Sequence, residues 1–397
     1  MIKIEHPDLI SISNKYSKNI KSLFLSKIND ILEVISILES SGIADEKTVL
    51  KKVNNFTSAI KIVIGKNKLL NSKHPVGEGK NTNDLIFTLN YYKIKSDKRS
   101  KCRKTKTYNE LKNKINNLAT FIQDNDLFGS LPYELIDLND ELKLLLTGIT
   151  KRAYNYFFNY NNYYTPINND LGKALDLKCC PYCNRNFITY IPDKNSRIIG
   201  PTYDHFFNKA RYEYLTLSFY NLIPSCYICN CNLKLDADFK LNTHLHPYLG
   251  GFGNDVFFDF ELSTKSNINN KKISFSLNLK PHHEISLQKK ERIFGIPTQK
   301  KSGNLNVFKL QEVYQSHGDS VEEIYRKFDK TSYYYIGSIS DIINKLNTSE
   351  EEFYRFYFRN YYKPIDFNKR PLAKLDRDIY NKLKMISEQT LHADIKV

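Results

Sequence analysis

Hydrophobic residues in the first part of the chain recur every three or four positions, which is the spacing of one face of an α-helix. The clearest run lies between residues 20 and 38 and ends at Ser40-Ser41-Gly42. Weaker runs of the same kind predict helices at about 49–64, 111–122 and 142–146. Stripes of this spacing more often build a core than a partner surface, so we interpret residues 1–150 as an N-terminal helical domain.

The pattern changes to strict alternation after residue 255. Apolar and polar residues alternate over 256–262 and again over 273–279. Because side chains of a strand point to opposite faces in turn, two such runs joined by a polar segment predict a β-hairpin with one buried face. The pattern then turns helical again, with Thr348 and Glu351 spaced as a capping box. We therefore expect residues 251–397 to form a hairpin followed by a helical region.

Length and charge narrow the class of protein. The chain has 397 residues, which is enough for two or three domains with packed cores. Its 59 Lys and Arg residues exceed its 43 Asp and Glu residues, and the net charge is +16. Such an excess favours polyanions, so nucleic acid is the expected partner. Abundant lysine, asparagine, isoleucine and tyrosine also follow from an AT-rich genome, so the charge alone strengthens this expectation only modestly.

Positive charge is densest between residues 93 and 106, where eight basic residues face a single acid, Asp97. Lys98, Arg99 and Arg103 are candidate phosphate contacts within this basic loop. A charge run of this kind is also typical of a solvated loop with no binding role. Both interpretations stay open on the sequence alone.

The cysteine content indicates a cellular compartment. Seven cysteines in a chain of this length fit a metal site in a reducing compartment better than a disulfide framework. No apolar run reaches the length of a membrane span, and the first residues, Met1-Ile2-Lys3-Ile4-Glu5, lack an apolar signal core. We therefore expect a soluble, cytoplasmic protein that does not enter a membrane.

Two Cys-x-x-Cys pairs are the strongest motif. They are Cys180 with Cys183 and Cys226 with Cys229. The spacing lets both sulfurs of a pair face one tetrahedral zinc ion. Zinc ribbons with such pairs often serve only to stabilise a fold or only to bind a partner. The cysteines by themselves therefore fit a purely structural site as well as a functional one. Cys179 and Cys231 flank the pairs as alternative ligands, although four ligands suffice.

Residues suited to hydrolysis lie between the cysteine pairs. Asp204-His205 follows the first pair, and Asn221 precedes the second. His205 is a candidate general base, because an imidazole exchanges its proton near neutral pH. Asp204 offers the hard oxygen ligand that Mg²⁺ or Mn²⁺ prefers. Adjacent residues of a strand face opposite sides, so both can serve one site only where the strand bends or ends.

The order Cys-x-x-Cys, Asp-His-Phe and Asn-Leu-x-Pro-x-Cys-x-x-Cys-Asn resembles the HNH endonuclease motif. Within that family it is most similar to the HNH subunits of Septu-type (PtuB-like) bacterial antiphage systems. The resemblance implies a ββα-metal fold, with His205 as general base and Asp204 as a ligand of a catalytic Mg²⁺ or Mn²⁺. It also implies that Asn221 orients the base, that Asn230 is a second metal ligand, and that Lys234 lies near the phosphate.

The resemblance covers roughly residues 171–384, and we expect the nuclease core at 170–250. The chain departs from the family at Asn208-Lys209-Ala210, where Pro-Lys-Ser is common. Lys209 is nevertheless a candidate nucleic-acid contact. His246-Pro247-Tyr248 also matches, and it serves either to close the domain or to complete the site.

The expected fold class is therefore α+β, a mostly helical chain with a central zinc-stapled ββα-metal core and an adjacent β-hairpin. The expected activity is metal-dependent cleavage of nucleic acid, with DNA favoured over RNA, by the effector of an antiphage system. The resemblance also implies an ATPase partner subunit. Two alternatives remain open, namely a non-catalytic zinc ribbon that binds nucleic acid and a subunit whose helices dock on a partner.

Overall fold

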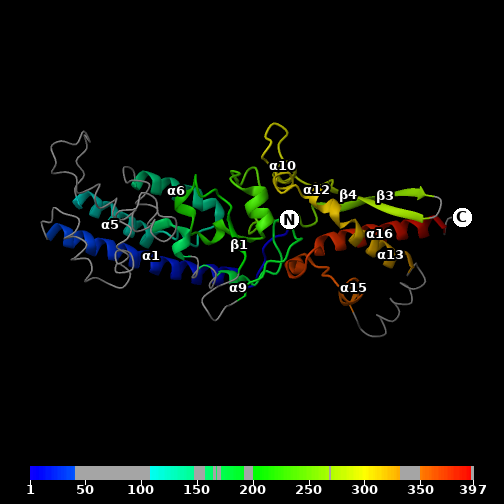
Figure 1. The fold of residues 1–397 in the computed structure, drawn as a ribbon, viewed down its shortest axis with the longest axis horizontal. Helices are drawn as coiled ribbons and strands as arrows, with labels where there is room; N and C mark the ends of the chain where they lie inside the picture. The colour runs from blue at the N-terminus through cyan, green and yellow to red at the C-terminus, as the bar shows by residue number, and fades with distance from the viewer. Residues whose placement is uncertain are drawn as a thin grey trace. The chain divides into compact units, whose positions relative to one another are not determined.

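The computed structural model describes residues 1–40, 108–146, 157–163, 167, 171–191, 200–267, 270–330 and 349–394. The chain divides into two compact units (Figure 1). The cysteine unit consists of Met1–Leu9, Gly172–Asn208 and Ile223–Val397, and the helical unit consists of Ile10–Leu171 and Lys209–Leu222. The predicted helix at 49–64 and the basic loop at 93–106 lie outside the described residues. None of the described helices is long and apolar enough to cross a membrane.

The units do not follow the domain boundaries that the sequence suggested. The first residues belong to the cysteine unit rather than to the helical one. Ile2 and Ile4 are buried there, and their backbone N–H groups donate to the carbonyl oxygens of Pro181 and Pro247, each at 2.8 Å. The predicted core at 170–250 and the predicted region at 251–397 share this unit, except for residues 170–171 and 209–222.

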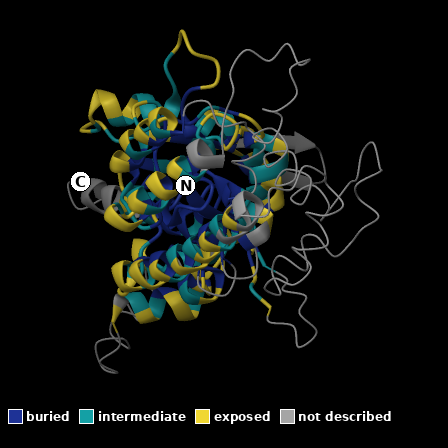
Figure 2. Cartoon of the chain, turned by 90° about the vertical axis from the view of Figure 1, so that its left-hand side faces the viewer, coloured by how far each residue is buried: buried dark blue, intermediate teal, exposed yellow. Residues whose placement is uncertain are grey.

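The helical unit is built on α1 (Leu9–Ser40), α5 (Tyr108–Asp124) and α6 (Pro132–Leu145). These helices confirm the three predictions made for described residues, and each extends beyond the apolar run that predicted it. Aromatic side chains fill the core, where the Phe24 ring lies 4.9 Å from Phe158 and 5.4 Å from Phe128 between ring centroids. Buried positions lie on the inner faces of the helices and exposed positions on the outer faces (Figure 2).

Residues 209–222 complete this helical core. The Tyr16 hydroxyl donates to the carbonyl of Leu217 at 2.8 Å, and the Phe219 N–H donates to the carbonyl of Phe128, also at 2.8 Å. Leu217 and Phe219 are fully buried. The sequence assigned this segment to the nuclease core because of its position between the cysteine pairs. Its apolar side chains instead belong with the aromatic core of α1.

The hairpin predicted from alternation is confirmed. Strand β3 (Val256–Asn267) pairs antiparallel with β4 (Asn270–Pro281), and Phe260 lies opposite Leu277. The alternate residues Val256, Phe258, Phe260, Leu277 and Leu279 are buried. The helices α13 (Gly318–Lys330) and α16 (Ala373–Asp394) pack against the hairpin and against each other.

Side chains from neighbouring helices satisfy both edges of this two-stranded sheet. The Leu279 N–H of β4 donates to the Gln311 side chain at 2.9 Å, from α12 (Leu310–Tyr314). On β3, the Phe258 N–H donates to Asp378 Oδ2 at 3.1 Å, and Lys382 Nζ donates to the Phe260 carbonyl at 2.6 Å. A two-stranded sheet would otherwise expose unpaired backbone groups along both edges. These polar residues of α12 and α16 therefore hold the hairpin in the cysteine unit.

The other α-helices that the structure describes in the cysteine unit are short. They are α9 (Lys173–Leu175), α10 (Leu287–Phe294), α11 (Asn304–Val307) and α15 (Glu350–Phe358). The capping box at α15 uses Ser349 and Glu352, each side chain bonding the other's backbone N–H, at 3.2 and 2.9 Å. The sequence predicted Thr348 and Glu351, so the prediction was wrong by one residue. Ser349 and Thr348 are both competent caps, and spacing alone does not choose between them.

Helix α16 also carries a buried ion pair. Lys374 Nζ lies 2.8 Å from Asp378 Oδ2, and the two side chains are 1% and 3% exposed. Lys374 also donates to the carbonyl of Gly253 at 2.8 Å. The pair therefore fastens α16 to the loop that precedes β3.

Asp376, on the same helix, is buried with an incomplete set of partners. Asn360 Nδ2 donates to its Oδ2 at 2.6 Å, whereas within the described part of the chain its Oδ1 is buried without a hydrogen-bond partner. Burial raises the pKa of Asp376 to about 7, against the opposing effect of Asn360. Three further charged groups act on it, namely Lys327, Glu323 and Arg370.

This raised pKa makes the stability of the unit pH-dependent. The folded state keeps Asp376 protonated up to about pH 7, whereas the unfolded chain ionises it above about pH 4. The contribution of Asp376 to the unfolding free energy is therefore fully present at low pH and is lost as the pH rises from about 4 to about 7. We expect Asp376→Asn to raise the unfolding free energy at pH 8 by up to about 4 kcal/mol, because the pKa is raised by roughly three units and each unit corresponds to about 1.36 kcal/mol.

Urea unfolding at pH 5 and pH 8 measures this effect. Glu312→Gln is the matched control, because it removes an exposed carboxylate from α12. The control should follow the wild type at both pH values. Equal loss of stability between pH 5 and pH 8 in Asp376→Asn and wild type would contradict the prediction.

Candidate functional site

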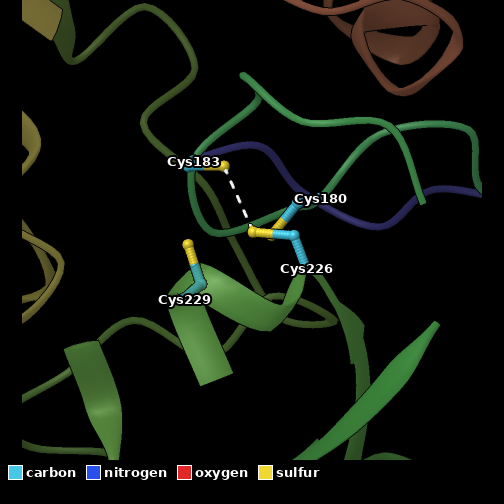
Figure 3. Close-up of side chains that lie close together, drawn as sticks. All are labelled: Cys180, Cys183, Cys226 and Cys229. Atoms are coloured by element: carbon cyan, nitrogen blue, oxygen red, sulfur yellow. Dashed lines mark hydrogen bonds between the residues drawn. The ribbon is translucent and has the colours of Figure 1, made fainter. Parts of the chain in front are cut away.

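The two cysteine pairs converge on one point inside the cysteine unit. The sulfurs of Cys180, Cys183, Cys226 and Cys229 all lie within 4.8 Å of one another, and all four residues are buried. Figure 3 shows the sulfur atoms turned toward one another, with the Cys183 and Cys226 sulfurs 3.9 Å apart. Tetrahedral zinc–sulfur bonds of about 2.3 Å place sulfurs roughly 3.8 Å apart. The cluster can therefore hold a metal such as zinc, as its spacing predicted.

The first pair sits in a tight turn that fixes its sulfurs. Asn184 follows Cys183 with φ 50°, a left-handed conformation that asparagine tolerates better than most residues. The Asn184 N–H donates to the Cys180 carbonyl at 2.8 Å, and the Cys180 N–H donates to the Asn186 carbonyl at 3.0 Å. The turn thus brings both sulfurs of the pair to one side.

Hydrogen bonds to sulfur support a thiolate cluster. The Arg185 N–H points to Cys183 Sγ at 3.4 Å, and Asn186 Nδ2 points to Cys226 Sγ at 3.3 Å. Donors of this kind stabilise negative charge on sulfur and orient metal ligands. The Asn186 bond also joins the first cysteine pair to the second.

The rest of the unit is fastened to this turn. The Asn184 side chain donates to the Phe367 carbonyl at 2.8 Å and accepts from the Lys374 N–H at 3.2 Å. The Tyr314 hydroxyl donates to the Cys183 carbonyl at 2.5 Å. The cysteine cluster therefore contacts both α12 and the start of α16.

The two flanking cysteines lie outside the cluster. Cys179 is fully buried and pairs through its backbone with Phe187. Burial raises the pKa of the Cys179 thiol to about 12, so this thiol stays protonated. Cys231 is only half-buried on the following helix. The four predicted cysteines, and neither alternative, form the cluster.

A two-stranded sheet and a short helix adjoin the cluster. Strand β1 (Thr202–His205) pairs with β2 (Leu222–Ser225), and the Thr202 hydroxyl donates to the Ser225 carbonyl at 2.8 Å. The second cysteine pair follows β2, and η6 (Ile228–Lys234) then packs against β1. The helix has a π-type turn, in which the Leu235 N–H donates to the Asn230 carbonyl at 3.2 Å. It ends at Lys234.

Asp204 is held by two neighbours. The Tyr182 hydroxyl donates to its Oδ2 at 2.6 Å, and Lys234 Nζ donates to its Oδ1 at 2.8 Å. Burial and the Asp204 charge raise the pKa of Tyr182 well above its ordinary value, so the hydroxyl remains a donor. Tyr182 lies between Cys180 and Cys183 in the sequence. It therefore links the cysteine turn directly to strand β1.

Lys234 is enclosed by β1 and by aromatic rings. It is 2% exposed, and its Nζ also donates to the His205 carbonyl at 2.6 Å. The same ammonium lies 4.8 Å from the centroid of the Phe239 ring, on which His244 stacks at 3.9 Å. Burial lowers the pKa of His244 to about 4, so His244 adds no positive charge beside Lys234 at neutral pH.

The predicted base and second ligand lie on adjoining elements. His205 ends β1 and is 9% exposed, and Asn230 is half-buried on η6. Asn221 is buried in the helical unit, where its Nδ2 donates to the Leu215 carbonyl at 2.8 Å. Lys209 is exposed and also belongs to the helical unit.

The other candidate nucleic-acid contacts have different placements. Lys98, Arg99 and Arg103 lie outside the described residues. Lys234 is buried rather than open to a phosphate. His246 is also buried, with its ring 4.2 Å from that of Phe206. This packing favours the interpretation in which the His-Pro-Tyr segment closes the unit.

Sequence reasoning missed Tyr182 and the pairing of Asp204 with Lys234. No sequence pattern links the aromatic residue inside a Cys-x-x-Cys pair to an acidic residue some twenty positions later. Lys234, as a lysine on a short helix, is expected from its type alone to be exposed. Only the folded structure shows that Lys234 lies next to Asp204.

The arrangement at Asp204 does not fit a divalent cation as it stands. An ammonium and a hydroxyl already bond its two oxygens, and the carboxylate side chain is only 4% exposed. Among the described residues, groups of three or more His, Cys or acidic side chains converge at two places, the cysteine cluster and the surface group His282, His283 and Glu284. Neither includes Asp204.

No protein-family model, curated protein or solved structure matches this chain.

The cysteine cluster makes a direct prediction. We expect the purified protein to retain bound zinc and Cys183→Ser to lose it, because three thiolates no longer complete a tetrahedral site. The unfolding free energy of the variant should fall by several kcal/mol. Metal analysis by mass spectrometry and thermal unfolding test this.

Cys231→Ser is the matched control, since Cys231 lies outside the cluster. It should keep the zinc content and unfolding temperature of the wild type. A zinc-free protein that stays folded in the Cys183→Ser variant would show that the cluster does not hold the unit together.

Proposed function

We propose that this chain is an HNH-type endonuclease that hydrolyses phosphodiester bonds of nucleic acid. One observation supports the proposal most strongly. Two paired strands and a following short helix, in the same unit as the cysteine cluster, carry His205 at the end of β1 and Asn230 on η6. The order of strand, strand and helix is the one that the sequence resemblance implies.

In the proposed reaction, His205 accepts a proton from a water molecule whose oxygen attacks phosphorus. The bond from phosphorus to the 3′-oxygen breaks, and that oxygen gains a proton from solvent. The resemblance implies a 5′-phosphate and a 3′-hydroxyl as products. The Lys234 bond to the His205 carbonyl fixes the backbone at the end of β1, where His205 must be positioned.

We assign zinc in the cysteine cluster a structural role. Four thiolates complete a tetrahedral shell and leave no open position for water or substrate. The resemblance further implies Mg²⁺ or Mn²⁺ at Asp204 and Asn230. Asp204 in its present pairing does not fit that ion, and we assign the proton transfer to His205.

The substrate and partners follow from charge and resemblance. The net charge of +16 supports a polyanionic substrate, and DNA is the favoured one. The role as an antiphage effector with an ATPase partner is supported by the resemblance. Within the described part of the chain the cysteines form no disulfide, which supports a reducing compartment such as the cytoplasm.

A second candidate function is a non-catalytic zinc module that binds nucleic acid. The buried pair of Asp204 and Lys234 favours it, because a carboxylate neutralised by an internal ammonium is a normal structural feature. This alternative predicts binding without cleavage, and the same binding by a variant that lacks the His205 imidazole.

We expect His205→Ala to cut plasmid DNA at least about a hundredfold more slowly than the wild type, because general-base catalysis contributes on this scale. Its zinc content and its binding of DNA should stay unchanged. The assay compares plasmid DNA and RNA, each with and without Mg²⁺ and Mn²⁺.

His283→Ala is the control for loss of a histidine, because His283 is exposed, with 80% of its side chain accessible. Cleavage by the control should match the wild type. Undiminished cleavage by His205→Ala would remove His205 as the base. Binding without cleavage by the wild type, under all these conditions, would favour the second candidate.

A further inference from the structure

The pair formed by Asp204 and Lys234 is the most deeply enclosed charge arrangement at the candidate site. The two side chains are 4% and 2% exposed, and the ammonium lies 2.8 Å from Asp204 Oδ1. The same ammonium bonds the His205 carbonyl at 2.6 Å, and the Phe239 ring covers it at 4.8 Å. The carboxylate, the carbonyl and the ring thus surround a single positive charge.

This enclosure has an electrostatic consequence. A buried carboxylate is costly unless a positive charge compensates it, and Lys234 supplies that charge. A divalent cation at Asp204 would lie only a few ångströms from the ammonium, and like charges at that distance repel strongly where water is excluded. Tyr182 meanwhile bonds the other oxygen at 2.6 Å. Carboxylate, ammonium and hydroxyl therefore form a satisfied group without a metal ion.

We propose that Lys234 is the resident cation of Asp204, and that its ammonium excludes divalent cations from this carboxylate until it is displaced. The proposal rests on the proposed function in one respect only, namely that a metal ion bound at Asp204 would matter for nuclease activity. It changes the role of Lys234 from a phosphate contact to a positioning residue. Lys234 acts through Asp204 and the His205 carbonyl and, being 2% exposed, does not reach substrate in this arrangement.

The Lys234→Gln variant tests the proposal. Glutamine keeps N–H donors for Asp204 and for the His205 carbonyl but removes the charge. We expect its affinity for Mn²⁺ to rise at least about tenfold over the wild type, because the repulsion is gone. Mn²⁺ binding is followed by electron paramagnetic resonance without nucleic acid, so the result does not depend on nuclease activity.

Lys374→Gln is the matched control. Lys374 is equally buried and lies 2.8 Å from Asp378, so its replacement costs similar stability without touching Asp204. Its Mn²⁺ affinity should equal that of the wild type. Zinc content measured on each sample identifies protein in which the cysteine unit is intact.

A Mn²⁺ affinity in Lys234→Gln that is no higher than in the wild type would overturn the proposal. If the variant does not fold, wild-type crystals soaked in millimolar MnCl₂ decide the question. The proposal expects no anomalous density at bonding distance from the Asp204 carboxylate, and such density with Lys234 still in place would overturn it. Absence of nuclease activity alone would weaken the proposed function and leave this result intact.

Discussion

The convergence of four buried sulfurs is the constraint on which the cysteine unit depends. Cys180, Cys183, Cys226 and Cys229 come from two turns that are far apart in the sequence, and their sulfurs lie within 4.8 Å of one another. Thiolates at this distance repel one another unless a cation lies between them. A bound metal ion would therefore hold the four cysteines together. Backbone and side-chain bonds then spread outward from the first turn to α12, α16 and the first residues of the chain.

A further hydrogen bond joins the cysteine cluster to the candidate site. Tyr182 lies inside the first cysteine pair and donates to Asp204, which in turn bonds Lys234 on the helix that follows the second pair. Each cysteine turn thus contributes one partner to the same carboxylate. The position of β1 relative to η6, and with it the placement of His205 and Asn230, depends on both turns being held together.

Much of this architecture was predictable from local patterns. Alternation located β3 and β4, the helical period located α1, α5 and α6, and cysteine spacing identified all four members of the cluster. Each of these signals is carried by residues close together in the sequence. The one-residue error at the Ser349 cap arose because two adjacent residues have the same local competence.

The features that sequence did not predict depend on distant contacts. Residues 209–222 sit between the cysteine pairs in the chain, yet Leu217 and Phe219 are buried in the helical core. Lys234 is of a residue type that is usually exposed, and only the fold brings it to Asp204. The roles of Asn221 and Asn230 in orienting the base and binding a metal remain predictions from the HNH resemblance, because motif order identifies residues without fixing their partners.

X-ray absorption at the zinc edge of the purified wild-type protein tests the central claim most directly, because it counts the atoms bound to the metal and measures their distances. A shell of four sulfur atoms at about 2.3 Å would agree with a zinc ion bound by all four cysteines of the cluster. A protein without zinc, or a zinc shell that contains nitrogen or oxygen ligands, would contradict it.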